Sequence, residues 1–365
     1  MDNSVLFKSF VIFIPIFVIL FMGAFYINDF RGGGSVLFGI RIPKEYVSDE
    51  RLLNIKKKYK RNIAIICSIL FIIFCILLIS TSVVLGVLIS VLGFILLSGM
   101  FYYSSYKKVL EIKNTENWTM LSSKKVILDI SVERENIMLS LWWYVIPFAI
   151  AIIGFLIVLF NINDLPNQVA LHFGFNGPDE FGAGNDIGTK LQVLFLPLLS
   201  IMVLCIVFFS VKGMKNKSQR INGGSVEEVK ARNTNNKKYT SIMMLIIALI
   251  ISIWMLLLSL ITLEFIPYST ELMFIPMVNL LGIMLVFMIL YIKDNKKKEN
   301  IDNEEIYIDD DNPYKLGGLF YYSKTDPRVW IEKRSGLGYT VNNATVGGKI
   351  FWIIILIIIL LPALL

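Results

Sequence analysis

Charged residues are scarce in this chain of 365 residues: they make up 17% of it, whereas 56% is apolar. A soluble fold cannot bury that much apolar surface, so the composition excludes an ordinary water-soluble domain. The apolar residues also come in unbroken runs, whereas the strands of a membrane β-barrel alternate apolar and polar residues. The composition therefore predicts an integral membrane protein made of helices.

Residues that catalyse reactions or bind metals are also few. The chain has one histidine, His172, and three cysteines, whereas a zinc peptidase needs several imidazole or carboxylate ligands at set spacings. It contains no HExxH, GxSxG, P-loop or CxxC motif. The cysteines fall within apolar runs and indicate no disulfide framework. We therefore expect a protein that is not an enzyme, with no catalytic residue, no metal and no cofactor.

Several apolar runs have the length of membrane-spanning helices. The second and third form one stretch, which we divide at Ser80, Thr81 and Ser82 because it is too long for a single crossing. The last is short for a span. The sequence thus predicts an all-α polytopic membrane protein with about eight transmembrane helices. The predicted spans are residues 7–27, 62–80, 83–103, 142–160, 191–211, 241–263, 272–292 and 350–364.

The interiors of these spans contain no ionisable residue. Ion-coupled transporters usually keep such groups in mid-membrane, where they are costly and therefore functional. Prolines interrupt the spans at Pro15, Pro147, Pro197 and Pro276, and a broken helix can surround a substrate site. Without partner charges, kinking and packing explain these prolines more simply. A transporter or exporter subunit therefore stays the alternative function.

The basic residues predict the orientation. Positive loops tend to stay in the cytoplasm, so we expect a multi-pass cell-membrane protein with both termini extracytoplasmic and the loop 161–190 outside. The same topology, with contact to anionic lipid, explains the net charge of +7, so the bilayer is the expected partner and nucleic acid is not. All but Lys8 and Lys190 of the 35 Lys and Arg residues lie in residues 28–61, 104–141, 212–240 and 293–349.

The chain is expected to divide into four parts. Residues 1–292 form a seven-helix membrane bundle with an outer loop module at 142–200, and residues 293–312 form a charged linker. Residues 313–349 form a small β-rich cytoplasmic module, and residues 350–365 form the last transmembrane helix. Aromatic and β-branched residues predict two or three short strands in the module. So small a module has a marginal core of its own, and we expect it to pack on the bundle or on headgroups.

The outer loop is the most informative segment. Turn-forming residues around Asp164 and Pro166 follow the fourth span. The residues from Gln168 to Phe173 then alternate in character, which predicts a strand. A second turn that includes Gly177 precedes an acidic cluster.

Two interpretations of this loop stay open. It can be a lid whose phenylalanines, Phe173, Phe175 and Phe181, touch the helix ends. Alternatively, His172 and the carboxylates of Asp164, Asp179 and Asp186 can form a site for a cationic peptide, a metal or a proton, or a catalytic cluster. One histidine among scattered acids argues against a metal.

The loop resembles the LP..IP.HF...G..D....K signature of a bacterial membrane module of unknown function. That module is shared with the immunity protein of the sporulation-delaying toxin system, the SdpI family. Ala170 stands where the family commonly has proline, and Gly174 where it often has asparagine. The residues that carry the resemblance are Leu165, Pro166, Val169, His172, Phe173, Gly177, Asp179 and Lys190.

Two further segments are similar to parts of longer relatives. Phe38, Gly39, Arg41, Pro43 and Glu45 resemble an FGVRVPEE segment, and residues 314–343 are similar to a small C-terminal module. The resemblance implies a Gram-positive cell-membrane protein. Resistance to a secreted peptide toxin and relay to a transcriptional regulator are implied by the immunity branch only.

We therefore predict a non-enzymatic membrane protein for immunity or envelope-signal sensing towards a secreted peptide. A secreted peptide and a cytoplasmic regulator are its candidate partners. The hypothetical ligand-binding residues are Asp164, Pro166, His172, Phe173, Gly177, Asp179 and Lys190.

Overall fold

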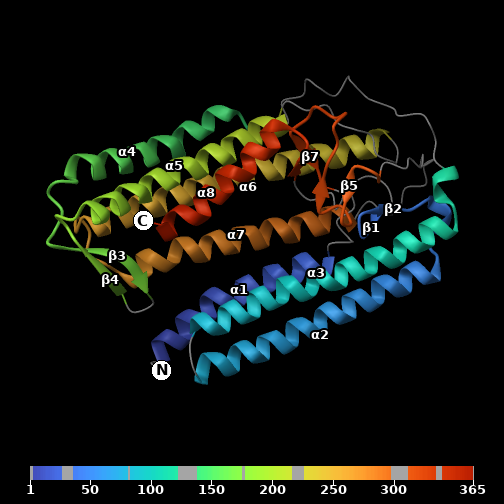
Figure 1. Cartoon of the computed structure of the whole chain (residues 1–365), viewed down its shortest axis with the longest axis horizontal. Helices are drawn as coiled ribbons and strands as arrows, with labels where there is room; N and C mark the ends of the chain where they lie inside the picture. Colours follow the sequence, from blue (N-terminus) through green and yellow to red (C-terminus); the bar gives the residue numbers. More distant parts are fainter. Residues whose placement is uncertain are drawn as a thin grey trace.

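The structure is a computed structural model that describes residues 3–26, 36–80, 83–121, 138–174, 177–215, 226–296, 311–333 and 339–364. These residues form long helices that run along the long axis of the molecule (Figure 1), as predicted, with pairs of short strands at both ends. The helices are α1 (Asn3–Tyr26), α2 (Glu50–Ser80), α3 (Val83–Thr115), α4 (Val145–Asn161), α5 (Ile187–Lys215), α6 (Val226–Thr262), α7 (Thr270–Lys296) and α8 (Val346–Leu364).

Seven of the described helices, α1 to α7, are long and apolar enough to cross a membrane. The chain is thus compatible with a multi-pass membrane protein. The eighth predicted span does form a helix, α8, and its crossing of a membrane stays a prediction. The predicted division of the second and third spans is confirmed, because α2 ends at Ser80 and α3 begins at Val83.

Three helices continue well beyond the predicted spans. α2 begins at Glu50, α3 ends at Thr115 and α6 begins at Val226. In α2 the extra turns are amphipathic: Leu52 and Tyr59 are buried in line with Ile63, while Lys57 and Lys58 are exposed. Because the lysines interrupt the apolar run, the sequence predicts the membrane span of α2 and not the extra turns before it.

The helices form two groups. α1, α2 and α3 contact one another, and so do α4, α5 and α6. α7 contacts α6 and α1, and Figure 1 shows it between the groups. In α3, Gly86, Ser90 and Gly93 follow one helix face; the glycines lie against α2 side chains, and the Ser90 hydroxyl donates to the Leu70 carbonyl. Small residues of this kind allow two spanning helices to approach closely.

Strands distinguish the two ends of the bundle. One end carries β3 (Gln168–Gly174) and β4 (Gly177–Ala183), and we call it the hairpin end. The opposite, basic end carries β1 (Val36–Leu37), β2 (Ile40–Arg41) and the C-terminal strands. Figure 1 shows both chain termini toward the hairpin end. That the hairpin and both termini share one side of a membrane stays a prediction.

The β1–β2 hairpin is buried at the basic end. Its two-residue turn, Phe38–Gly39, has φ angles of 47° and 80°, as a type I′ turn requires. The Phe38 side chain is fully buried between the rings of Tyr59 and Tyr102, at centroid distances of 5.0 and 5.4 Å. The FG pair in the first basic segment is therefore a packed corner of the bundle.

Small strand pairs lie where the sequence predicts the β-rich module at 313–349; we call the described residues 311–333 and 339–349 the module. It contains two hairpins: β5 (Tyr314–Lys315) pairs with β6 (Phe320–Tyr321), and β7 (Trp330–Glu332) pairs with β8 (Tyr339–Val341). A bridge between Tyr321 and Asn342 joins them. The predicted linker begins inside α7, and its residues 297–310 lie outside the described residues.

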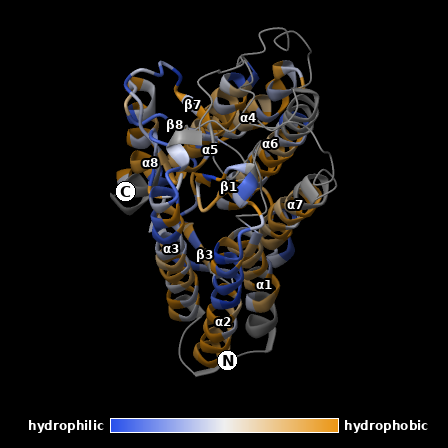
Figure 2. Cartoon of the chain, turned by 90° about the vertical axis from the view of Figure 1, so that its right-hand side faces the viewer, coloured by the Kyte–Doolittle hydropathy of each residue, from blue (hydrophilic) through white to orange (hydrophobic). Residues whose placement is uncertain are grey.

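The module contacts both helix groups. On the first group, Asp311 accepts from the Lys113 ammonium at 2.6 Å and from the Arg41 backbone N–H at 3.3 Å. The Tyr102 hydroxyl donates to the Gly317 carbonyl at 2.6 Å. On the second group, Tyr339 packs against the core around Tyr144 and Met214. Figure 2 looks onto this end and shows β1, β7 and β8 among the helix ends.

Candidate functional site

The loop predicted as the functional site forms a β-hairpin. β3 pairs antiparallel with β4, from Gln168 opposite Ala183 to Gly174 opposite Gly177. The register shifts around Leu171, which breaks the alternation predicted for β3. Val169 is fully buried and packs with Val158 of α4, Val193 of α5 and Leu263. The base of the hairpin is thus part of the core at the hairpin end.

Glycines allow close packing at this base. Any Cβ on Gly184 would collide with the carbonyl oxygen of Pro166, and a Cβ on Gly182 would collide with the hydroxyl of Thr189. The Gly184 N–H also donates to the Asn167 carbonyl at 3.2 Å. Pro166, a predicted site residue, therefore contributes its backbone to the base of the hairpin.

Two polar residues of the predicted loop site have structural contacts here. Asp186 begins α5, where its side chain accepts from the backbone N–H of Thr189 at 2.9 Å, as an N-cap does. The Lys190 ammonium donates to the side-chain oxygen of Asn163 at 3.2 Å. Asp186 and Lys190 thus hold the start of α5 and the turn after α4, and they are not gathered around His172.

The exposed part of the hairpin brings His172 and Asp179 together. His172 Nδ1 lies 2.5 Å from Asp179 Oδ1, across the two strands, with side chains that are 63% and 55% exposed. Of the predicted carboxylates, it is Asp179 that reaches the imidazole; Asp164 is exposed in the turn after α4. An exposed ion pair contributes at most about 1 kcal/mol to stability. Loss of this contact would therefore cost the fold little free energy.

An aromatic contact supports the neighbouring face. Phe173 stacks on Tyr268 at a centroid distance of 5.9 Å and an interplanar angle of 7°. Gly177 has a φ of 123° and is buried beside the same ring. Phe173 thus makes the predicted lid-like contact, although with the loop between α6 and α7. Phe181 is 54% exposed, and its predicted contact with helix ends stays a prediction; Phe175 lies outside the described residues.

The sequence interpretation missed two parts of this site. The β4 strand was not predicted because Gly177, Pro178, Asp179 and Glu180 are poor strand formers. Tyr268 was not predicted either, because it is distant in sequence. Its position directly after Pro267, in a short connection between two spans at the hairpin end, was the available signal.

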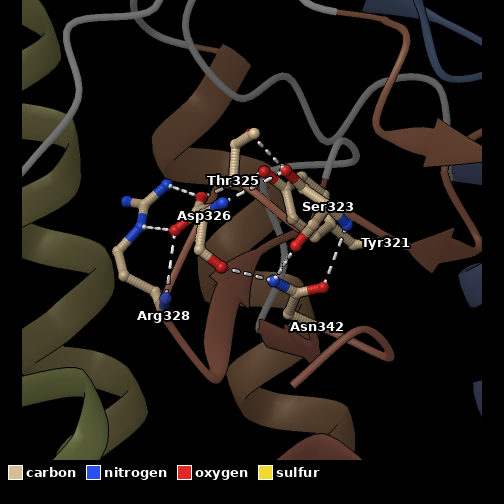
Figure 3. A network of polar contacts seen from close by, with 6 residues as sticks. All are labelled: Tyr321, Ser323, Thr325, Asp326, Arg328 and Asn342. Carbon is tan, nitrogen blue, oxygen red and sulfur yellow. Dashed lines mark hydrogen bonds and ion pairs between the residues drawn. The ribbon is translucent and has the colours of Figure 1, made fainter.

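A second polar cluster lies in the module (Figure 3). The carboxylate of Asp326 accepts from the Arg328 guanidinium at 2.8 and 2.5 Å and from the Tyr321 hydroxyl at 3.0 Å. The Asn342 amide donates to the carbonyls of Ser323 and Asp326 at 2.9 and 2.8 Å. The cluster joins β6, the following loop and Asn342 directly after β8, and it adds polar contacts to the buried apolar side chains of Ile331 and Val341.

Asp326 is ionised in this cluster. Burial alone would raise its pKa, but the hydrogen bonds from the Arg328 side chain and backbone and from Tyr321 outweigh burial and hold the pKa well below its ordinary value. The same carboxylate raises the pKa of Arg328. Because each partner is already engaged within the module, we interpret this cluster as structural.

The residues that the structure describes hold no group of three or more His, Cys, Asp or Glu side chains fit to bind a metal ion. The exposed His172–Asp179 pair alone offers too few ligands for a zinc site. The carboxylate of Asp179 can accept hydrogen bonds and pair with a cation, and the imidazole of His172 can donate or accept a hydrogen bond.

Comparison with known proteins gives one match. Residues 324–349 match a family of unknown function, DUF5808. The matched segment contains Asp326, Arg328 and Asn342 of the polar cluster, and it overlaps the segment whose sequence resembles a small C-terminal module. No curated protein matches the chain, and no solved structure matches it. The resemblance of the hairpin to the SdpI family stays a prediction.

Proposed function

We propose that this chain is a non-enzymatic protein of a bacterial cell membrane that senses, or gives immunity to, a secreted peptide through the β3–β4 hairpin. The observation that supports the proposal is the His172–Asp179 pair, which is exposed on a hairpin whose base is fixed in the core. A rigid base with a weakly held polar pair is suited to recognition, because the ligand need not order the site first.

The hairpin also offers a way to bind an extended peptide. In the described residues β3 and β4 form a sheet of two strands, and each strand of such a sheet has one edge without a strand partner. An extended peptide can add to an edge of this kind through main-chain hydrogen bonds. Asp179 and its exposed neighbour Glu180 would then favour a peptide with basic side chains.

The proposal includes an orientation. By the distribution of basic residues, the hairpin and both termini face outward and the module faces the cytoplasm. A secreted peptide would meet the hairpin first, and a cytoplasmic regulator would meet the basic end.

The test is survival of a strain that lacks this protein, across a panel of secreted antimicrobial peptides. The strain is complemented with the wild type, His172→Ala, Asp179→Ala or the control Gln168→Ala, which alters an exposed residue at the base of the same strand. We expect selective sensitivity to one peptide class, rescued by the wild type and the control and not by the two pair variants.

Unchanged survival of the deletion strain against every peptide would remove the immunity proposal. Transport, the alternative function, would then be the hypothesis to test. Rescue by both pair variants at normal expression would keep immunity and remove the His172–Asp179 pair from it.

A further inference from the structure

A groove runs along an exposed side of α4 near the basic end. It is a cavity of about 460 Å³ between α4 and α5, lined almost entirely by apolar atoms. Val145, Ala149 and Ile152 line it from α4, and Phe208 lines it from α5. Trp142 stands at its basic-end mouth and is 81% exposed.

The length of the groove matches one leaflet of a bilayer. Its lining runs from Leu141 to Ile152. Residues 141–144 form a 3-10 turn and residues 145–152 belong to α4, so at rises of about 2.0 and 1.5 Å per residue the lining extends over roughly 18 Å. The hydrocarbon core of a membrane is about 30 Å thick, so the groove covers about half of it. Exposed Trp142 and Trp143 mark the interfacial level, where tryptophan is enriched.

The charge near this mouth suits a phospholipid with an acidic headgroup. Lys212 is exposed and lies one helical turn beyond Phe208 toward the basic end, on the same face of α5. Its ammonium would meet the phosphate of such a lipid.

We propose that this groove binds one anionic phospholipid from the leaflet at the basic end, with an acyl chain along Val145, Ala149 and Ile152 and the headgroup at Lys212. Charge complementarity sets the preference for an acidic headgroup, and groove length sets the depth of the chain. The proposal is independent of the function proposed for the hairpin.

The test measures retained lipid. The full chain is reconstituted in phosphatidylcholine vesicles that contain a minor fraction of phosphatidylglycerol, extracted in mild detergent, and examined by native mass spectrometry. Ala149→Phe fills the groove at an exposed position, and Ile153→Phe is its matched control, because Ile153 is also exposed on α4 but does not line the groove. Lys212→Gln removes the cation, and Lys108→Gln removes an exposed lysine from α3.

We expect the wild type and both controls to retain one phosphatidylglycerol preferentially. Ala149→Phe should lose that lipid, and Lys212→Gln should lower the preference over phosphatidylcholine about fivefold. Equal retention by Ala149→Phe and the wild type would overturn the groove as the site. An unchanged preference in Lys212→Gln would overturn the headgroup contact, and equal loss in Ile153→Phe would show ordinary boundary lipid.

Discussion

At the scale of single residues, the polar contacts of the hairpin and of the module differ in their exposure to solvent. His172 and Asp179 form an exposed pair, whereas the Asp326 side chain is 7% exposed and satisfied by Arg328 and Tyr321. The first pair adds little to stability and is free to change partner. The second is costly to disturb, because removal of a donor or of the charge leaves buried polar groups unpaired.

We expect Asp326→Asn to loosen the module. The substitution keeps the size of the side chain but removes the charge that the Arg328 guanidinium meets, and hydrogen bonds to charged groups contribute about 1.5–3 kcal/mol. Hydrogen exchange of the amides of β6 and β8 in the full chain should accelerate accordingly. Lys324→Gln, at an exposed position of the same loop, should leave the exchange unchanged, and equal effects of the two variants would contradict the account.

The same carboxylate predicts a pH dependence. Because the folded module lowers the pKa of Asp326, the unfolded chain binds the proton more readily than the folded one. Stability from this group is therefore complete above the ordinary aspartate pKa of about 4, and it declines as the pH falls below that value. Exchange of the β6 and β8 amides, corrected for intrinsic rates, should show a loss of protection below about pH 4 that is absent in Asp326→Asn. A rise in protection toward acid pH would contradict the sign.

At the scale of elements, the sequence predicts the helices and strands whose apolar residues form a long run or a regular alternation. Apolar runs place α1 to α7 correctly, and alternation places β3. The extension of α2 needs the amphipathic spacing of Leu52 and Tyr59, and β4 lies on residues of low strand propensity. It forms because β3 and the core at the hairpin end supply its pairing and its anchor, and such tertiary support overrides propensity.

Within the site, the sequence likewise does not predict that Asp179, and not Asp164, contacts His172. Both aspartates flank the histidine in sequence, and nothing in their spacing separates them. The hairpin register decides, because it places His172 opposite Glu180, one residue from Asp179. The polar cluster of the module was not predicted either, because Asn342, which follows β8, lies 19 and 16 residues from Ser323 and Asp326 in the sequence.

We expect Gly184→Ala to destabilise the base of the hairpin. The new Cβ would collide with the carbonyl oxygen of Pro166, and overpacking of this kind costs about 1–3 kcal/mol. Amide protection in β3 and β4 should fall. Gly282→Ala is the matched control, because a Cβ there meets nothing within 4 Å and helix propensity favours alanine. Unchanged protection in Gly184→Ala would show that the base is not closely packed.

At the scale of the whole molecule, the module joins parts of the chain that are far apart in sequence. Asp311 meets Lys113 of α3, with side chains that are 16% and 7% exposed. A Cβ on Gly213 of α5 would collide with Trp330 of β7. The module therefore packs against both helix groups at the basic end, while α7 lies between them.

We expect Lys113→Ala to weaken the docking of the module on the first helix group. Truncation of the lysine leaves the carboxylate of Asp311 largely buried without this ion pair, at a cost of up to about 3 kcal/mol. Exchange should accelerate in β5 and β6, whereas β3 and β4 at the opposite end should keep their protection. Lys108→Ala, an exposed position on the same helix, serves as the control. Acceleration at both ends would indicate global unfolding and contradict a local role.

The central claim, an outward hairpin that meets a secreted peptide, is tested most directly by labelling on intact cells. Glu180→Cys is introduced after the native Cys67, Cys75 and Cys205 are replaced by alanine, and a membrane-impermeant maleimide is added with and without the peptide that the survival panel identifies. We predict labelling without permeabilisation and protection by the peptide, while Lys324→Cys in the module labels only after permeabilisation. Labelling of Glu180→Cys only in permeabilised cells would contradict the account.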